Sequence, residues 1–83
     1  MPIKISLHAK EQMLERGASE EEVKIAVQKG EKQEAKKGRI IYKKNFQFNG
    51  HWREREYKIK QVSPVVAIDG DEIIVVTVYV FYF

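Results

Sequence analysis

The amino-acid sequence predicts an α+β domain in which a helical hairpin packs on one face of a three- to four-stranded antiparallel sheet. Two observations indicate this fold class. Serine caps and glycine stops delimit two short helices within the first 30 residues. From residue 31 onward, apolar residues recur with a period of two, which is typical of strands. The 83 residues are enough for a single domain, which spans residues 1–83.

The chain begins with signals for a short strand and a first helix. Ile3 and Ile5 lie two residues apart, which suits an optional leading strand. Ser6 is placed to cap a helix, and Gly17 is placed to end it in the left-handed conformation that glycine tolerates best. The first helix is therefore predicted over roughly residues 6–16.

A second helix follows almost at once. Ser19 and Glu22 have the spacing of a capping box, in which each side chain accepts a hydrogen bond from the other residue's backbone N–H. Gly30 is predicted to end this helix in the same way as the first, so the helix spans roughly residues 19–29. Because only Ala18 separates the first stop from the second cap, the helices must form a tight hairpin.

The remaining residues predict strands. Residues 31–37 form a weak, highly charged strand that suits a sheet edge. Pro64 predicts an edge or a bend, and residues 65–68 and 72–80 predict a hairpin about an Asp-Gly-Asp turn. Residues 73–83 are apolar on both faces, as expected of a central strand.

Asn49-Gly50 is the strongest hairpin signal in the chain, and it predicts a two-residue type I′ turn. Such a turn fixes the register, so that Tyr42 faces Tyr57 and Phe46 faces Arg53. One face of this hairpin then combines cations with aromatic rings, in the residues Lys44, Phe46, Phe48, His51, Arg53 and Arg55.

Basic residues are concentrated in this part of the chain. Residues 36–60 contain nine basic and two acidic side chains, a net charge of +7, within a chain whose net charge is +3. Arginines among exposed aromatics suit single-stranded RNA, because cations bind phosphates and flat rings stack on bases. The predicted RNA-binding residues are Lys44, Phe46, His51, Arg53 and Arg55. The structural alternative is a solvated hairpin on which arginine stems cover buried Phe46 and Phe48.

His8, Gln12 and Arg16 follow one another at spacings of four and form a polar stripe beside the apolar arc of the first helix. A side chain at this border is rooted in the core and still reaches solvent. The functional interpretation is a site for His8 and Arg16. The structural interpretation is that they satisfy carboxylates or backbone carbonyls where the helix meets the sheet.

Composition excludes several function classes. The chain has no cysteine, so it has no disulfide and no thiolate chemistry, and its two histidines lie too far apart in sequence to predict a metal site. No cofactor is expected. The N-terminus lacks the apolar stretch of a signal peptide, and the apolar C-terminal run is too short to span a bilayer as a helix. We therefore expect a cytoplasmic protein with no membrane partner.

The run from His8 to Val23 reads HAKEQMLERGASEEEV. Its pattern, His-Ala-x-x-x-Met-x-Glu-Arg-Gly followed by Ser-Glu-Glu-x-Val, resembles the domain of unknown function 4258 family. The resemblance extends over nearly the whole chain, to Thr77-Val78-Tyr79 in the last predicted strand. That family is in turn similar to RelE-like and BrnT-like toxins, which implies a RelE-like arrangement of the helical hairpin and the sheet.

The resemblance implies a metal-independent, toxin-type ribonuclease that acts on single-stranded or ribosome-bound RNA. Such an enzyme needs a base for the ribose 2′-hydroxyl, an acid for the leaving oxygen and cations for the transition state. The predicted catalytic residues are His8, Arg16, Arg55 and Tyr57. His51 is an alternative proton-transfer group, and Tyr79 is an alternative acid.

The expected partners follow from the toxin interpretation. A toxin of this size requires inhibition in trans, so we expect a small antitoxin that covers the basic hairpin and the apolar C-terminal strand. The same strand predicts a homodimer formed through its edge. The alternative is a non-catalytic RNA- or protein-binding module with the same fold, or a structural or regulatory oligomer.

Overall fold

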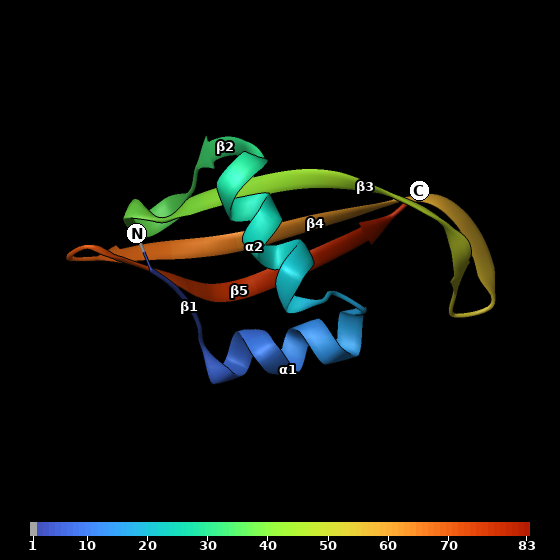
Figure 1. Ribbon diagram of the computed structural model, residues 1–83, viewed down its shortest axis with the longest axis horizontal. Coiled ribbons are helices and arrows are strands. Elements are labelled where there is room, and N and C mark those ends of the chain that lie inside the picture. Colours follow the sequence, from blue (N-terminus) through green and yellow to red (C-terminus); the bar gives the residue numbers. More distant parts are fainter. Residues whose placement is uncertain (1) are drawn as a thin grey trace.

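The computed structural model describes residues 2–83 and has an α+β fold with two helices on a five-stranded mixed sheet (Figure 1). The strands lie in the order β1-β5-β4-β3-β2. The elements in chain order are β1 (Ile3–Ile5), α1 (Leu7–Arg16), α2 (Glu20–Lys29), β2 (Glu31–Glu34), the 3₁₀ turn η1 (Lys36–Gly38), β3 (Ile40–Trp52), β4 (Arg55–Asp69) and β5 (Glu72–Tyr82).

The two predicted helices and their capped connection are confirmed, but the helices pack on the sheet and not along each other as a tight hairpin. The Ser6 side chain accepts a hydrogen bond from the Ala9 N–H at 3.1 Å, and Gly17 ends α1 with φ of 84°, in the left-handed region. Ser19 and Glu22 form the predicted capping box, with hydrogen bonds of 3.1 and 3.0 Å. Local capping signals thus determine both ends of the connection between the helices.

Gly30 ends α2, but not in the predicted left-handed conformation, because its φ is −75°. The chain continues directly into the extended strand β2. Glycine is favoured here by close packing instead. A Cβ at this position would lie 2.4 Å from the Ala26 carbonyl oxygen and 2.9 Å from that of Lys43.

One hydrophobic core joins the helices to one face of the sheet. Its buried residues are Ala9, Met13, Val23, Val27, Val62, Val66, Val75 and Val78. Figure 1 shows both helices on the same side of the sheet. We call the opposite side the helix-free face, because no helix covers it in the described part of the chain.

The sheet differs from the predicted one in strand number and direction. It has five strands, and β1 runs parallel to β5, from the pair Ile3–Ile73 to the pair Ile5–Val75. The sequence predicted only antiparallel pairs because short turns join consecutive strands, whereas this pair joins distant parts of the chain. The ammonium of Lys4 also contacts Glu72 at 2.7 Å, and this hydrogen bond raises the pKa of Lys4.

The hairpin of β3 and β4 turns at Arg53 and Glu54, so the predicted turn at Asn49-Gly50 is wrong. The two turn residues have φ of 50° and 71°, as a type I′ turn requires. Asn49 does have a positive φ, of 46°, but it lies in a register shift of the ladder between Gln47 and Gly50. The left-handed conformation of Asn49 therefore forms a β-bulge and not a turn, and β3 continues beyond it.

The predicted cross-strand pairs of this hairpin are consequently wrong. Phe46 lies opposite Lys60 and not opposite Arg53, and Tyr57 lies opposite Gly50 and not opposite Tyr42. The longer hairpin brings its aromatic residues against the last strand, and this packing outweighs the local turn preference.

Pro64 lies inside β4, a central strand, and not at the predicted edge or bend. Ile59 of β4 and Phe83 exchange backbone hydrogen bonds, and in an antiparallel ladder such bonded pairs recur at every second residue. Pro64 falls between two bonded positions, so its nitrogen points away from β5 and toward β3. The register of β3 and β4 contains no pair at Pro64. The missing N–H therefore falls where the ladder is already interrupted.

The interpretation of residues 73–83 as a central strand is confirmed in part, because β5 lies between β1 and β4 in the sheet order. Only residues 73–75 lie between two strands, because β1 is three residues long. Beyond Val75, the described residues 2–83 place no strand along one edge of β5. The strand is apolar on both faces because one face enters the core and the other carries exposed aromatic rings.

Candidate nucleic-acid interface

Three aromatic residues form a row on the helix-free face, at the C-terminal part of β5 and just beyond it. Tyr79, Phe81 and Phe83 expose 44%, 48% and 63% of their surfaces. Side chains alternate along a strand, so the intervening Val78 and Val80 face the core while this aromatic row faces solvent. The rings of Tyr79 and Phe81 stack with centroids 6.4 Å apart.

Polar groups lie beside the aromatic row on the adjacent strands. Ser63 lies opposite Tyr79, and Gln61 lies opposite Phe81. The amide of Gln61 donates a hydrogen bond of 3.0 Å to Asn45 on β3. The helix-free face therefore offers exposed aromatic rings next to amide groups that can donate and accept hydrogen bonds.

Arg16 brings a cation to one end of the aromatic row. Its guanidinium lies 5.4 Å from the centre of the Tyr79 ring and donates a hydrogen bond of 2.7 Å to the Val78 carbonyl. Gln12, one turn earlier on α1, accepts a hydrogen bond of 2.9 Å from the Val78 N–H. The contacts of Arg16 and Gln12 agree with the structural interpretation of the stripe, whereas His8 is exposed at the start of α1.

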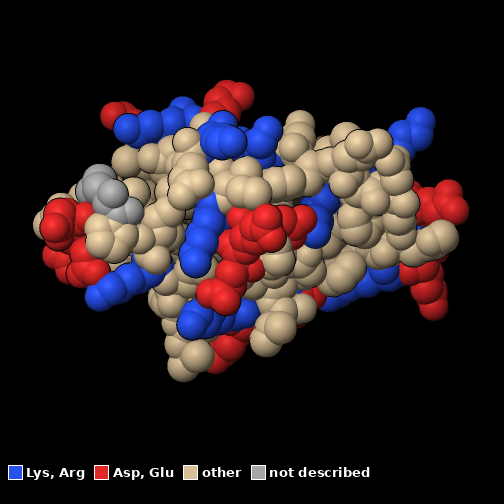
Figure 2. Space-filling view, in the orientation of Figure 1, with Lys and Arg blue, Asp and Glu red and all other residues tan. Residues whose placement is uncertain are grey.

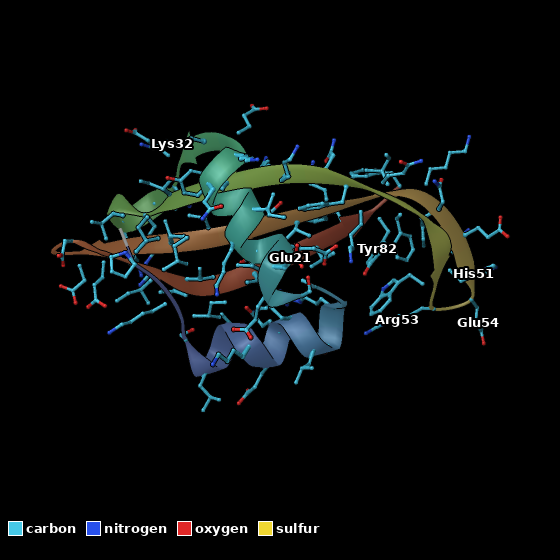
Figure 3. All side chains as sticks on the ribbon, viewed as in Figure 1. Glu21, Lys32, His51, Arg53, Glu54 and Tyr82 are labelled. Carbon is cyan, nitrogen blue, oxygen red and sulfur yellow. The ribbon has the colours of Figure 1, made fainter. Side chains whose placement is uncertain are left out.

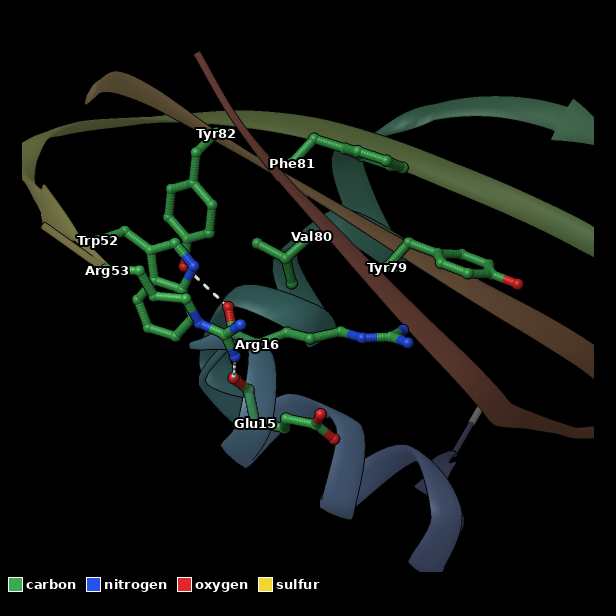
Figure 4. A pocket seen from close by; sticks show the side chains of 8 residues that line it. All are labelled: Glu15, Arg16, Trp52, Arg53, Tyr79, Val80, Phe81 and Tyr82. Carbon is green, nitrogen blue, oxygen red and sulfur yellow. Dashed lines mark hydrogen bonds between the residues drawn. The ribbon is translucent and has the colours of Figure 1, made fainter. Parts of the chain in front are cut away.

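A groove of about 350 Å³ separates the C-terminal end of α1 from the tip of the hairpin (Figure 4). Its wall along β5 is formed by residues 79–82. Arg53 crosses from the hairpin toward α1, donates a hydrogen bond of 3.3 Å to the Glu15 carbonyl and lies 5.3 Å from the centre of the Trp52 ring. Arg16 and Arg53 thus contribute two guanidinium groups to one groove.

Tyr82 is the centre of an aromatic cluster at the base of the hairpin tip. Trp52 stacks on it with centroids 5.0 Å apart, while Phe48 and Tyr57 lie at 5.2 and 5.5 Å. Its hydroxyl donates a hydrogen bond of 2.8 Å to the Arg16 carbonyl. A Cβ on Gly17 would lie 2.6 Å from this hydroxyl, so the left-handed glycine also permits the close approach of the cluster.

Lys60 is a buried cation behind this cluster, with 9% of its surface exposed. Its ammonium donates to the Gly17 carbonyl at 2.9 Å and contacts both oxygens of Glu22, at 2.8 and 2.9 Å. It also lies 5.5 Å from the centre of the Phe48 ring. Lys60 therefore joins the turn between the helices to the sheet and is not available to a ligand.

The structure separates the predicted RNA-binding residues. Phe46 packs against the core beneath the helices, in agreement with the structural alternative, and Lys44 is partly buried on the same face. Figure 3 shows Arg53 directed back toward α1, with His51 at the outer end of the hairpin. The His51 ring pairs with Glu56 at 3.3 Å. Arg55 is exposed beside the turn.

The predicted catalytic residues are likewise distributed over the molecule. His8 lies in the first turn of α1 and Arg16 in its last. Tyr57 is packed against Tyr82 in the aromatic cluster, and Arg55 belongs to the hairpin tip. Of these four residues, only Arg16 lines the groove beside the aromatic row.

The basic segment 36–60 does not form one patch. Lys36 and Lys37 lie in η1, Arg53 and Arg55 lie at the opposite end of β3, and the charge of Lys60 is neutralised by Glu22. Figure 2 shows basic and acidic side chains side by side on the helix side of the molecule. The local +7 charge is therefore divided between two ends and both faces of the sheet.

Sequence reasoning missed the aromatic row. The available signal was the period of two in Tyr79, Phe81 and Phe83, which places three aromatic residues on the same face of a strand. A continuous apolar run is consistent with burial on both faces, and the pattern does not identify which side of a sheet the helices cover. Trp52, which lines the groove, was missed because the incorrect hairpin register placed it elsewhere. Glu15, which was also missed, lines the groove from α1.

The pKa of Tyr82 provides a test of its burial. Burial raises this pKa above its usual value near 10, the charge of Glu22 raises it further, and Arg53 opposes the shift. A raised pKa means that folding favours the protonated phenol, so this stabilisation is complete below about pH 10 and is lost as the pH rises through the raised pKa.

We therefore expect the difference in unfolding free energy between the wild type and Tyr82→Phe to shrink above about pH 10. Urea titrations at matched pH values measure this difference, and the comparison cancels the titration of the lysines. A difference that stays constant up to the alkaline limit of folding contradicts the assigned environment of Tyr82.

Residues 2–83 contain no cluster of three His, Cys, Asp or Glu side chains suited to a metal ion. Among the same residues, no helix has both the length and the apolar character needed to cross a membrane.

Comparison with protein families identifies the family of this chain. The family model described as domain of unknown function (DUF4258) matches residues 5–80, which include both helices and most of the sheet. No curated protein and no solved structure matches the chain. The similarity to RelE-like and BrnT-like toxins therefore stays a prediction.

Proposed function

The chain belongs to the DUF4258 family, and we propose that it binds single-stranded RNA on the helix-free face of its sheet. The observation that carries the proposal is the aromatic row of Tyr79, Phe81 and Phe83, which is exposed on a face without a covering helix. Aromatic residues on an open sheet stack on unpaired bases, and neighbouring amides bond to base edges.

Cations next to the row support the same proposal. Arg16 lies over the Tyr79 ring and borders the groove, where a phosphate of a bound strand can reach its guanidinium. Lys43 is a second cation on this face, two strands from the row on β3 and opposite Glu31 of β2. It lies on the helix-free side because its neighbour Lys44 faces the helices with Val62. Phosphate contacts of this kind make affinity depend on salt, with a slope of about −0.7 per neutralised phosphate for single strands.

The direct test is the replacement of Phe81 by alanine, measured by fluorescence anisotropy with a labelled single-stranded oligoribonucleotide. Stacking of one base on one aromatic ring contributes about 1–3 kcal/mol, so we expect roughly a 5- to 150-fold loss of affinity. Phe81→Tyr, which keeps the flat ring, is expected to bind nearly as tightly as the wild type.

Leu14→Ala is the matched control, because Leu14 is an apolar residue on α1 that is 86% exposed. Its removal is expected to leave RNA affinity unchanged. Equal losses for Phe81→Ala and Leu14→Ala, or a Phe81→Ala variant that binds like the wild type, contradict the proposed interface. Circular dichroism of each variant verifies that the fold is retained.

The cationic hairpin tip remains a separate proposal for RNA binding. Of the predicted residues, Arg53 and Arg55 are exposed, whereas Phe46 packs beneath the helices. The double variant Arg53→Ala with Arg55→Ala is expected to lose more RNA affinity than Lys58→Ala, a change at an exposed lysine of β4. Lys60 cannot be part of this comparison, since its replacement removes a buried ion pair.

Cleavage of the bound RNA is the second candidate function, and one juxtaposition favours it. The groove next to the row is lined by Glu15, Arg16, Arg53 and the residues from Tyr79 to Tyr82. A carboxylate can accept the proton of a ribose 2′-hydroxyl, which attacks phosphorus, while a tyrosine hydroxyl protonates the leaving 5′-oxygen. The guanidinium groups stabilise the developing charge on the phosphate.

Toxin-type activity has two observable consequences. Expression without a small antitoxin partner slows bacterial growth, and purified protein converts end-labelled or ribosome-bound RNA into fragments ending in a 2′,3′-cyclic phosphate. Arg16→Ala is expected to relieve both effects. A wild-type chain that is harmless and leaves RNA intact while still binding it excludes cleavage and leaves the non-catalytic module.

A further inference from the structure

The outer edge of β5 presents backbone groups in a defined alternation. Phe83 and Ile59 exchange two hydrogen bonds, of 2.9 and 3.1 Å, and form a bonded pair of the antiparallel ladder. Bonded pairs recur at every second residue, so Tyr79 and Phe81 also bond to β4. The N–H and C=O groups of the intervening residues, Val80 and Tyr82, therefore point away from β4 toward the outer edge.

The backbone N–H and C=O groups of Val78 also point toward the outer edge, and side chains of α1 bond to both of them. Gln12 accepts from its N–H at 2.9 Å, and Arg16 donates to its C=O at 2.7 Å. These two residues of α1 thus occupy the hydrogen-bonding positions of a neighbouring strand. For Val80 and Tyr82, residues 2–83 supply no strand in that position, because β1 ends its pairing at Val75.

The unpaired edge lies in the groove between α1 and the hairpin tip, as Figure 4 shows. Unpaired edge strands bind further strands through their backbone groups. Arg16 and Arg53 border this edge, and Glu15 is the single carboxylate among its lining residues. A second copy of this chain, paired about a two-fold axis, would bring four guanidinium groups together, so charge disfavours self-association here.

We infer that this groove binds an extended, acidic peptide segment of a partner protein, which adds a short strand to β5. The peptide backbone pairs with the N–H and C=O groups of Val80 and Tyr82. Carboxylate side chains of the peptide bind the guanidinium groups of Arg16 and Arg53. The side chains of Gln12 and Arg16 at Val78 limit the added strand at one end. Peptide binding in this groove is an interaction beyond RNA binding on the aromatic row.

The test uses the full chain and a short synthetic peptide that alternates valine with threonine and carries aspartate at both ends. Hydrogen–deuterium exchange followed by NMR reports each amide of β5. We expect the peptide to slow exchange at Val80 and Tyr82, whose N–H groups point outward. Tyr79 and Phe81, already bonded to β4, are expected to change little.

Two variants test the contacts by fluorescence anisotropy of the labelled peptide. Val80→Pro removes the outward donor without removing a bond to β4, and we expect at least tenfold weaker peptide binding. Arg53→Gln is expected to weaken binding several-fold, and Lys58→Gln, which makes the same charge change on an exposed residue outside the groove, is expected to have no effect. Circular dichroism verifies that Val80→Pro retains the fold.

Several results overturn the inference. They are no peptide binding by the wild type, unchanged exchange at Val80 and Tyr82, or equal affinities for wild type and Val80→Pro. Slowed exchange at these two amides caused by the oligoribonucleotide alone, without the peptide, assigns the groove to RNA and also overturns it. A failure of RNA binding in the Phe81→Ala test leaves this inference unaffected, because the peptide experiment uses different groups and a different probe.

Discussion

Replacement of Lys60 by alanine is expected to lower the free energy of unfolding by about 3–5 kcal/mol, the range for removal of one partner of a buried ion pair. The variant leaves the Glu22 carboxylate without its counter-ion and the Gly17 carbonyl without its donor. A domain of this size has a total stability of roughly 4–12 kcal/mol, so Lys60→Ala removes a large fraction of it. Urea unfolding followed by circular dichroism measures the change.

Two matched variants separate the ion pair from other effects of this substitution. Lys58→Ala, two residues away on the exposed side of β4, is expected to change stability by less than about 0.5 kcal/mol. In the double variant Lys60→Met with Glu22→Gln, the methionine fills similar space and the glutamine keeps the capping box. This double variant is expected to be more stable than Lys60→Ala. Should Lys60→Ala and Lys58→Ala cost the same, the buried pair has no structural importance.

Replacement of Tyr82 by alanine is expected to cost about 3 kcal/mol, at the lower end of the range for removing a large aromatic side chain, because the residue is only partly buried. The reason is its central position, since Phe48, Trp52 and Tyr57 all pack on its ring. Loss of the ring releases the hairpin tip from α1. Thermal unfolding, with tryptophan fluorescence reporting on Trp52, measures both the stability and the local change.

Tyr82→Phe and Phe83→Ala are the controls for this prediction. Tyr82→Phe keeps the stacked rings and loses only the hydrogen bond to the Arg16 carbonyl, worth about 1 kcal/mol. Phe83 is adjacent in sequence but belongs to the exposed aromatic row, so its replacement is expected to cost less than that of Tyr82. A larger effect at Phe83 than at Tyr82 would show that the cluster does not hold the hairpin.

The two capped helices illustrate what sequence-local rules determine. The caps at Ser6 and Ser19 and the left-handed Gly17 depend on hydrogen bonds and backbone conformations within a few residues, so the sequence alone predicted them. The same applies to the final hairpin, in which Gly70 has a φ of 62° in the turn between β4 and β5.

The β3–β4 hairpin illustrates where such rules stop. Asn49 adopts the expected positive φ, yet Arg53 and Glu54 form the turn, because contacts with a strand some thirty residues later stabilise the longer hairpin. A change of register moves side chains relative to both faces of a sheet. This single difference therefore displaced the predicted RNA-binding set, and Phe46 became part of the core packing.

The sequence by itself determined the α+β class, the two capped helices, the edge strand β2 and the family to which the chain belongs. Only the tertiary structure decided the parallel pairing of β1 with β5, the register of β3 and β4, and which alternating residues of β5 remain exposed. The physical reason is the range of the interactions involved. Capping and turn preferences act between near neighbours, whereas sheet order, register and exposure depend on non-local packing against elements that sequence periodicity does not identify.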